Sequence, residues 1–131
     1  MDNYEREIVE LHQFFEDWFT GRLPNDDAAF ARFADTMAPD FHIVSPSGRL
    51  TARPDLLAGL RGAYNAWNAG RIWIENVQVR AAYGDISIVT YEEWQSTGDG
   101  ERGRLSTVVF RADANAVNGL LWLHVHETWL P

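Results

Sequence analysis

The sequence predicts an α+β fold in which a curved, mostly antiparallel sheet packs against helices on one face. Two patterns in the 131-residue chain indicate this. Residues 3–70 contain three segments in which large apolar side chains recur every three or four positions, as on one face of a helix. Residues 72–130 are rich in β-branched and aromatic residues that alternate with period two, as in strands. We expect a single domain over residues 1–131.

The first predicted helix begins at Asp2 or Asn3, either of which can cap it, and ends at Gly21. Its apolar stripe, with steps of three and four residues, consists of Tyr4, Ile8, Leu11, Phe15 and Trp18. A second helix is predicted between Asn25 and Pro39, because a proline disfavours helical backbone in the residue before it. Its apolar side carries Phe30, Phe33 and Met37.

A short hairpin and a third helix follow. Residues 41–45 have the composition of a strand, residues 45–48 form a turn that contains proline and glycine, and residues 50–52 return as a short partner. Pro54 suits the first turn of a helix that Gly70 closes. The stripe of this helix consists of Leu56 or Leu57, Leu60, Tyr64 and Trp67.

Four strands make up the rest of the chain. In the first, residues 72–83, the apolar positions slip from even to odd numbers, which predicts a β-bulge near Glu75–Asn76 that bends the strand. The other three strands are predicted at residues 86–95, 104–111 and 120–130, joined by turns that contain glycine.

Strand parity predicts which side chains face the helices. If the more apolar face of the last strand packs on the helices, the concave face of the sheet carries Ile88, Thr90, Glu92, Trp94, Ser106, Val108, Phe110, Val125, Glu127 and Trp129. The opposite face of that strand carries Trp122, His124, His126 and Thr128 and would meet a second subunit. A single bulge would invert this assignment.

The composition excludes several kinds of site. Without cysteine there is no disulfide and no thiolate, and without lysine there is no Schiff-base chemistry. A net charge of −8 argues against nucleic acid and anionic membranes as partners. No segment is apolar and long enough to cross a bilayer and the N-terminus lacks an apolar signal core, so we expect a cytoplasmic protein.

The order of elements resembles the nuclear transport factor 2-like superfamily, whose fold is also called cystatin-like. Residues 39–48, followed by residues 53–57, resemble its first hairpin and the helix after it. Residues 84–89 resemble the entry to its central strand. Residues 122–126 resemble its final strand, and also that of the association domain of calmodulin-dependent kinases. The closest local resemblance is to the SnoaL-like branch of small bacterial proteins.

The resemblance implies a cone-shaped α+β barrel in which a curved mixed sheet wraps over three helices. It also implies a pocket between the helices and the concave face, and a homodimer through the convex face. We therefore expect a SnoaL-like protein that binds a small apolar or aromatic molecule without a cofactor. The predicted pocket residues are Phe15, Trp18, Phe33, Tyr64, Trp67, Trp94, Phe110 and Trp129.

Two glutamates are the predicted catalytic residues of an alternative function, a cofactor-independent acid–base enzyme such as an isomerase, cyclase or dehydratase (a lyase). Glu92 and Glu127 share the predicted concave face, where apolar surroundings would raise the pKa of a carboxyl. The non-catalytic interpretation of the two glutamates is that they lie at the open rim of the pocket, or form ion pairs with arginines such as Arg80 or Arg104. Steroid isomerases of the superfamily have a basic Asp in an Asp-Pro-x-Gly turn, and this chain has Ser45 there.

Three histidines form the alternative catalytic set. His124 and His126 share a strand face and would enter the pocket if the parity is inverted. The resemblance to polyketide cyclases and dehydratases of the superfamily, which have a His and an Asp in the pocket, makes His42 the third candidate. A metal would need a third ligand, such as His42 or Glu93, and His-x-His alone is a weak motif, so we predict hydrogen bonding and no metal site. A third alternative is a non-catalytic homo-oligomeric association module.

Overall fold

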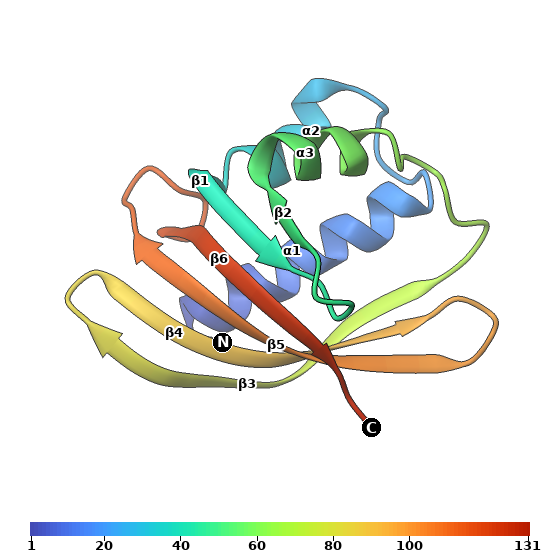
Figure 1. Ribbon diagram of the computed structural model, residues 1–131. Coiled ribbons are helices and arrows are strands. Elements are labelled where there is room, and N and C mark those ends of the chain that lie inside the picture. Colours follow the sequence, from blue (N-terminus) through green and yellow to red (C-terminus); the bar gives the residue numbers. More distant parts are fainter.

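Six strands form one curved sheet in the order β2-β1-β6-β5-β4-β3 (Figure 1). This computed structural model describes residues 1–131. Neighbouring strands are antiparallel except β1 and β6, which are parallel. The predicted α+β class, with a curved mixed sheet and three helices, is therefore confirmed. The strands are β1 (Met37–Val44), β2 (Leu50–Ala52), β3 (Arg71–Tyr83), β4 (Ile86–Ser96), β5 (Glu101–Ala112) and β6 (Leu120–Trp129).

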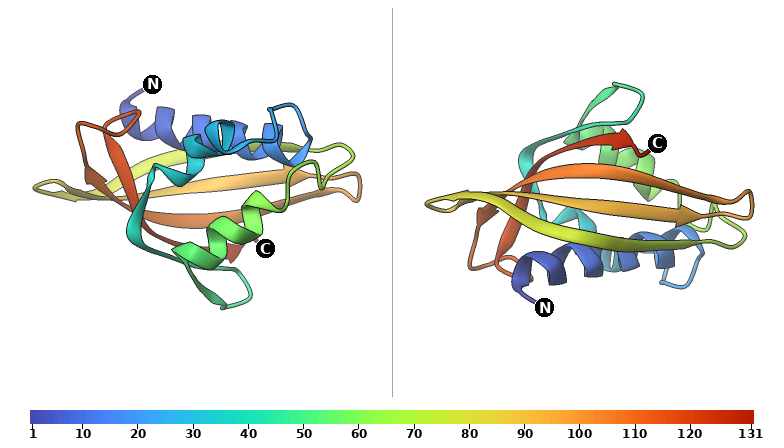
Figure 2. Two further views of the ribbon diagram at one scale, coloured as in Figure 1. Left: turned by 90° about the horizontal axis from the view of Figure 1, so that it is seen from above. Right: turned by 90° about the horizontal axis from the view of Figure 1, so that it is seen from below.

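Three helices lie on one side of the sheet, and no helix covers the other side, which faces the viewer in the right-hand view of Figure 2. They are α1 (Asn3–Phe19), α2 (Asp27–Ala34) and α3 (Arg53–Arg61). The side chain of Asp2 caps α1 by accepting a hydrogen bond from the Glu5 N–H. Helix α3 ends at Arg61, well before the predicted end at Gly70. No helix is long and apolar enough to span a membrane.

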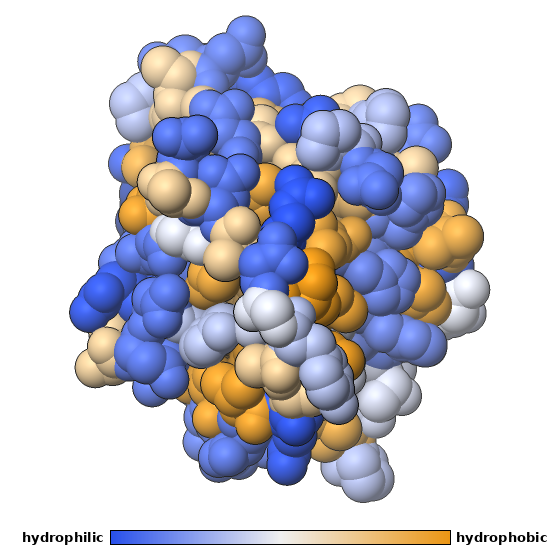
Figure 3. Space-filling view, turned by 90° about the vertical axis from the view of Figure 1, so that its left-hand side faces the viewer, coloured by the Kyte–Doolittle hydropathy of each residue, from blue (hydrophilic) through white to orange (hydrophobic).

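The core forms where the stripe of α1 meets the concave face of the sheet. Ile8, Leu11 and Trp18 are buried, as the step of three and four predicts, and they belong to one cluster with Val89 and Val108. Apolar burial of this extent is the main stabilising contribution to such a domain. At the end of the molecule that lies at the left in Figure 1, apolar side chains also reach the surface in patches between polar ones (Figure 3).

The predicted parity is wrong for β4. Ser87, Val89, Tyr91 and Glu93 are the buried residues of this strand, so Ile88, Thr90, Glu92 and Trp94 lie on the convex face. Both faces of β4 carry large side chains, so its own alternation does not determine its orientation. The register with β5 does, because it places Tyr91 opposite the buried Ser106.

The predicted parity is right for β5 and for the second half of β6. Ser106, Val108, Phe110, Val125 and Glu127 are all buried. The first half of β6 differs because a register shift separates two of its pairs, Val109 with His124 and Phe110 with Trp122. This irregularity turns Trp122 into the core instead of toward a second subunit. The bulge predicted in β3 is confirmed, with Asn76 at a φ of 56°.

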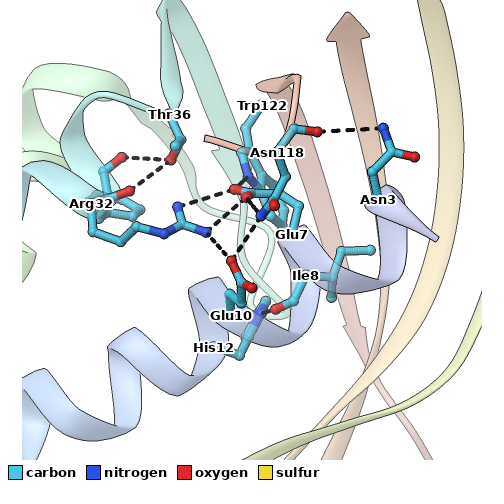
Figure 4. Close-up of polar contacts among 10 residues, drawn as sticks. Asn3, Glu7, Ile8, Glu10, His12, Arg32, Thr36, Asn118 and Trp122 are labelled. Atoms are coloured by element: carbon cyan, nitrogen blue, oxygen red, sulfur yellow. Dashed lines mark hydrogen bonds and ion pairs between the residues drawn. The ribbon is translucent and has the colours of Figure 1, made fainter. Parts of the chain in front are cut away.

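A fully buried carboxylate ties α1 to α2 and β6 (Figure 4). Both oxygens of Glu7 accept hydrogen bonds from the Arg32 guanidinium, at 2.8 and 3.3 Å. The Trp122 indole N–H and the Asn118 side-chain amide donate to the same carboxylate at 2.8 and 2.9 Å. Since these donors satisfy it, Glu7 acts as a structural anchor.

Candidate ligand-binding pocket

A cavity of about 400 Å³ lies between the helices and the concave face of the sheet. Hydrophobic side chains make up 14 of the 21 residues that line it, so its wall is mainly apolar. They are Leu11, Phe15, Phe19, Phe33, Met37, Phe41, Ile43, Leu56, Leu60, Trp67, Ile72, Tyr91, Trp122 and Val125.

Five of the polar lining residues come together as one polar cluster, which we define as His12, Glu93, Gln95, Arg104 and Glu127. His12 comes from α1, and the other four come from the three adjacent strands β4, β5 and β6. The sheet register aligns them, because Glu93 pairs with Arg104 across β4 and β5, and Ser106 pairs with Glu127 across β5 and β6.

His12 is held as a cation by its two hydrogen-bond partners. Its Nδ1 lies 2.7 Å from the Ile8 carbonyl oxygen, and its Nε2 lies 3.1 Å from Glu93 Oε1. A carbonyl and a carboxylate only accept, so both ring nitrogens donate, which requires the protonated ring. Burial alone would lower the pKa of His12, but the charge and hydrogen bond of Glu93, with the Ile8 carbonyl, raise it. His12 therefore has no free ring nitrogen to offer a ligand.

Glu93 is the ionised partner in this pair. Burial alone would raise its pKa, but the His12 cation and then Arg104 hold the pKa well below its usual range. Its second oxygen, Oε2, accepts a hydrogen bond of 2.6 Å from the Gln95 amide. Both oxygens are thus occupied.

Glu127 is the carboxyl of the cluster that is easiest to protonate. Arg104 Nη1 donates to its Oε1 at 2.9 Å, and the Ser106 hydroxyl donates to its Oε2 at 3.4 Å. Burial, and then the negative charge of Glu93, raise the pKa of Glu127 in spite of the Arg104 cation. A carboxyl with a raised pKa is a better proton donor at neutral pH than an ordinary one, and Glu127 lies on the cavity wall.

The predicted position of Glu92 is wrong. It lies on the convex face, where its carboxylate accepts hydrogen bonds from the Asn76 amide at 2.6 Å and the Trp94 indole at 3.0 Å. Glu93, the next residue along the same strand, occupies the cavity instead. Trp94 shares the convex face with Glu92 and lines no part of the cavity.

The other predicted pocket residues fall into three groups. Phe15, Phe33 and Trp67 line the cavity. Trp18, Tyr64 and Phe110 do not line it, because they pack in the core cluster or against it. Trp129 lies on the concave side at the end of β6, opposite Arg104 in the register, and its ring stacks with Arg102 and Arg104.

The three predicted histidines lie on the convex face, away from the cavity. His42 and His124 are direct neighbours across β1 and β6, and His126 follows two residues later. Burial, and then the charges of His126 and His42, lower the pKa of His124. No group of three or more histidine or acidic side chains is arranged to hold a metal ion.

Of the five cluster residues, only Glu127 was predicted as a site residue. Glu93 was considered only as a metal ligand and Arg104 only as an ion-pair partner, and His12 and Gln95 were not considered. A signal for His12 exists, since it lies four residues after Ile8 and directly after Leu11, inside the buried stripe of the first helix. A histidine in such a stripe needs a buried partner, and a carboxylate is the usual one.

The sequence matches the family model of the sucrose-6-phosphate phosphohydrolase C-terminal domain over residues 4–131. A probable sucrose-phosphatase 2 of Arabidopsis thaliana is 30% identical over 130 residues, which cover 97% of this chain. Sucrose-phosphatase 1 of Nicotiana tabacum is 28% identical over 127 residues, or 95% of this chain. The chain spans about 30% of the length of these relatives.

Solved structures with the same fold include an NTF-2-like protein of unknown function from Pseudomonas aeruginosa. It is 30% identical, with a TM-score of 0.88, and the alignment covers 98% of this chain and 99% of that one. The calmodulin-dependent kinase II hub of S. rosetta, 20% identical with a TM-score of 0.63, covers 81% and 83% and shows the fold alone. The comparisons do not confirm the predicted SnoaL-like branch. The chain has the nuclear transport factor 2-like fold and belongs to the sucrose-6-phosphate phosphohydrolase C-terminal family.

Proposed function

We propose that this chain binds a small apolar or aromatic molecule in the cavity beneath its helices. One observation carries the proposal: about 400 Å³ of space has a mainly hydrophobic wall, and its polar side chains are concentrated in one cluster. Apolar pockets with a few convergent polar groups are typical small-molecule sites. The single-domain organisation, the cytoplasmic location and the SnoaL-like resemblance stay predictions.

Sucrose phosphate, which the names of the relatives indicate, is a poor fit to this cavity. Such a molecule carries hydroxyl groups all round and a phosphate of nearly two negative charges. The polar cluster has two cations, His12 and Arg104, and each already lies beside a carboxyl group. A dianion would therefore be left largely uncompensated. We propose that the chain contributes ligand binding, and not phosphate hydrolysis, to proteins of this family.

A fragment screen tests the proposal with a cavity-blocking variant and a matched control. Leu56→Trp places an indole in the cavity, because Leu56 lines it, whereas Leu50→Trp adds the same group at a position that is 63% exposed. We expect small aromatic fragments to bind the wild type and Leu50→Trp by ligand-observed NMR, and to lose binding to Leu56→Trp. If the wild type binds no apolar fragment at millimolar concentration, the proposal is wrong.

A second candidate function is cofactor-free acid–base catalysis, of the isomerase, cyclase or dehydratase type, in which Glu127 donates the proton. The raised pKa of Glu127 and its place on the cavity wall favour it. Glu127→Gln would lower the rate of such a reaction by about 100-fold or more, and Glu92→Gln, on the other face, would not. The wild-type rate should fall as the pH rises through the raised pKa. Equal rates in both variants would remove Glu127 from the mechanism.

We also propose a homodimer through the convex face. No helix covers that face, and it carries Ile88, Val109 and the 40% exposed Leu105. A charge placed there, Val109→Glu, should convert the dimer to a monomer, and Val117→Glu, in an exposed loop, should not. Light scattering measures both. If the wild-type protein is monomeric throughout a 100-fold range of protein concentration, the proposal is wrong.

A further inference from the structure

We propose that the ligand of this pocket is a small aromatic or branched aliphatic carboxylic acid, bound as its anion with the carboxylate against Arg104. This inference rests on the proposed ligand-binding function and adds to it the chemical class of the ligand. Three features of the structure support it: an unused donor of Arg104, a second arginine beside it, and a neighbouring carboxyl that can take up a proton.

Arg104 has a donor without an acceptor. Its Nη1 donates to Glu127, but its Nε–H is buried and makes no hydrogen bond. The Glu93 oxygen Oε2 lies 3.9 Å from that nitrogen, which is too far for a hydrogen bond. Buried donors are nearly always paired, and leaving one unpaired is costly. Arg104 lines the cavity and only its Nη1 has an acceptor in the protein, so the remaining edge of the guanidinium is the part that a bound ligand could satisfy.

The protein's own carboxylates are already occupied. Glu93 receives His12 on one oxygen and Gln95 on the other, so it cannot turn toward Arg104 without losing a hydrogen bond. Glu127 already receives Arg104 Nη1 and Ser106. The missing acceptor is thus best supplied by a ligand. A carboxylate suits it most closely, since its two oxygens match the planar fork of an arginine.

A second arginine, Arg102, lies beside Arg104 just outside the residues that line the cavity. The guanidinium carbons of Arg102 and Arg104 lie 3.6 and 4.8 Å from the centre of the Trp129 ring. Arg102 pairs in register with Gln95, a cavity residue, and it forms no ion pair. In a chain of net charge −8, two cations on one indole form a local site of attraction for anions.

Glu127 can compensate the charge of a bound anion by taking up a proton. The charged and titratable groups that face it are Arg104 on β5, Glu93 and Tyr91 on β4, and His12 on α1. The raised pKa of Glu127 shows that this carboxyl is already destabilised as an anion. A ligand carboxylate nearby adds to that effect, so binding takes up a proton and the affinity falls as the pH rises. The protonated carboxyl then becomes a second donor to the ligand.

The experiment compares three probes of one shape: phenylacetate, phenylacetamide and 2-phenylethylamine. We expect phenylacetate to bind at least about tenfold more tightly than the amide at pH 6, because its hydrogen bonds are charge-assisted. That advantage should shrink at pH 8. Titrations followed by ¹⁵N NMR also show whether each probe shifts the signals of cavity residues.

Two variants of Arg104 and one control identify the binding group. Arg104→Gln should remove the preference for phenylacetate. Arg104→Lys keeps the charge and the ion pair but lacks the Nε–H, so it should weaken phenylacetate binding. It also serves as the folded variant if Arg104→Gln does not fold. Arg111→Gln, on the same strand but on the opposite face, should bind phenylacetate as the wild type does.

Each result decides between the two proposals. If the amide binds as tightly as phenylacetate and its affinity is independent of pH, the carboxylate inference is wrong and the apolar pocket still stands. If the amine binds most tightly, Glu93 and Glu127 recognise the ligand and the inference is overturned. If no probe binds, both the inference and the proposed function fail.

Discussion

Replacing His12 by phenylalanine should destabilise the fold strongly, because it leaves a buried carboxylate without its main cation. An aromatic ring, although a somewhat larger one, would still lie beside Phe15 and Tyr91, so the change acts mostly on charge. Removing one partner of a buried ion pair typically costs about 3–5 kcal/mol. Gln95 and Arg104 remain near Glu93, so we expect about 3 kcal/mol in the free energy of unfolding.

The double variant His12→Phe with Glu93→Leu separates the pair from its packing. With both charged groups gone, no carboxylate is left unpaired, so the double variant should be more stable than His12→Phe alone, by about 1–3 kcal/mol. Urea unfolding at pH 6 measures these differences in unfolding free energy, provided that all variants have the same m-value. A loss below about 1 kcal/mol for His12→Phe would refute the idea that the pair is charged and buried.

The pH dependence follows from the directions of the two pKa shifts. The pKa of His12 is raised, so its contribution is complete below pH 6.5 and is lost as the pH rises through the folded value. The pKa of Glu93 is lowered, so its contribution is present above pH 4.5 and is lost as the pH falls through the folded value. The pair therefore contributes most between those limits. The difference between wild type and His12→Phe should shrink on the alkaline side, and a constant difference up to pH 9 would contradict the assignment.

Two further predictions concern stability alone. Glu7→Gln should lower the free energy of unfolding by about 2 kcal/mol, since it weakens charge-assisted hydrogen bonds to Arg32. Glu10→Gln, at an exposed position, should lower it by less than about 0.5 kcal/mol. Urea unfolding compares the two variants. Gly103→Ala should cost about 1–3 kcal/mol, because its Cβ would lie 2.8 Å from the Trp94 ring, whereas Gly59→Ala, with open space in α3, should stabilise by about 0.5–1 kcal/mol. Thermal unfolding with tryptophan fluorescence measures both, and a Gly103→Ala protein as stable as the wild type would mean that Trp94 moves without cost.

The first helix and the bulge could be predicted from the sequence because their signals are local, whereas the second helix ends before Met37 and the third ends at Arg61. The spacing of Ile8, Leu11 and Trp18 is a property of one helix, and the change of apolar phase around Asn76 is a property of one strand. The orientation of β4 could not be predicted in this way. Its two faces are similarly apolar, and the choice between them depends on pairing with β5, which is a tertiary property.

The site was predicted only in part for the same reason. Of the predicted residues, Glu127, Phe15, Phe33 and Trp67 line the cavity, and Trp67 does so from the loop after α3. The inverted strand exchanged Glu92 for Glu93, and the irregularity in β6 brought Trp122 inside. His12 escaped notice because its partner is 81 positions away in the chain, beyond the range of any local pattern.

The central place of β6 in the sheet has a consequence for how the chain folds. Strand β6 lies between β1 and β5, and its parallel partner β1 precedes it by more than 80 residues. The hairpins of β3, β4 and β5 can pair early because their partners are near in sequence, but β1 and β2 cannot join them until β6 is in position. Closure of this long loop should therefore limit the folding rate. A nascent chain that lacks β6 would expose two unpaired strand edges, those of β1 and β5, and would be prone to aggregation.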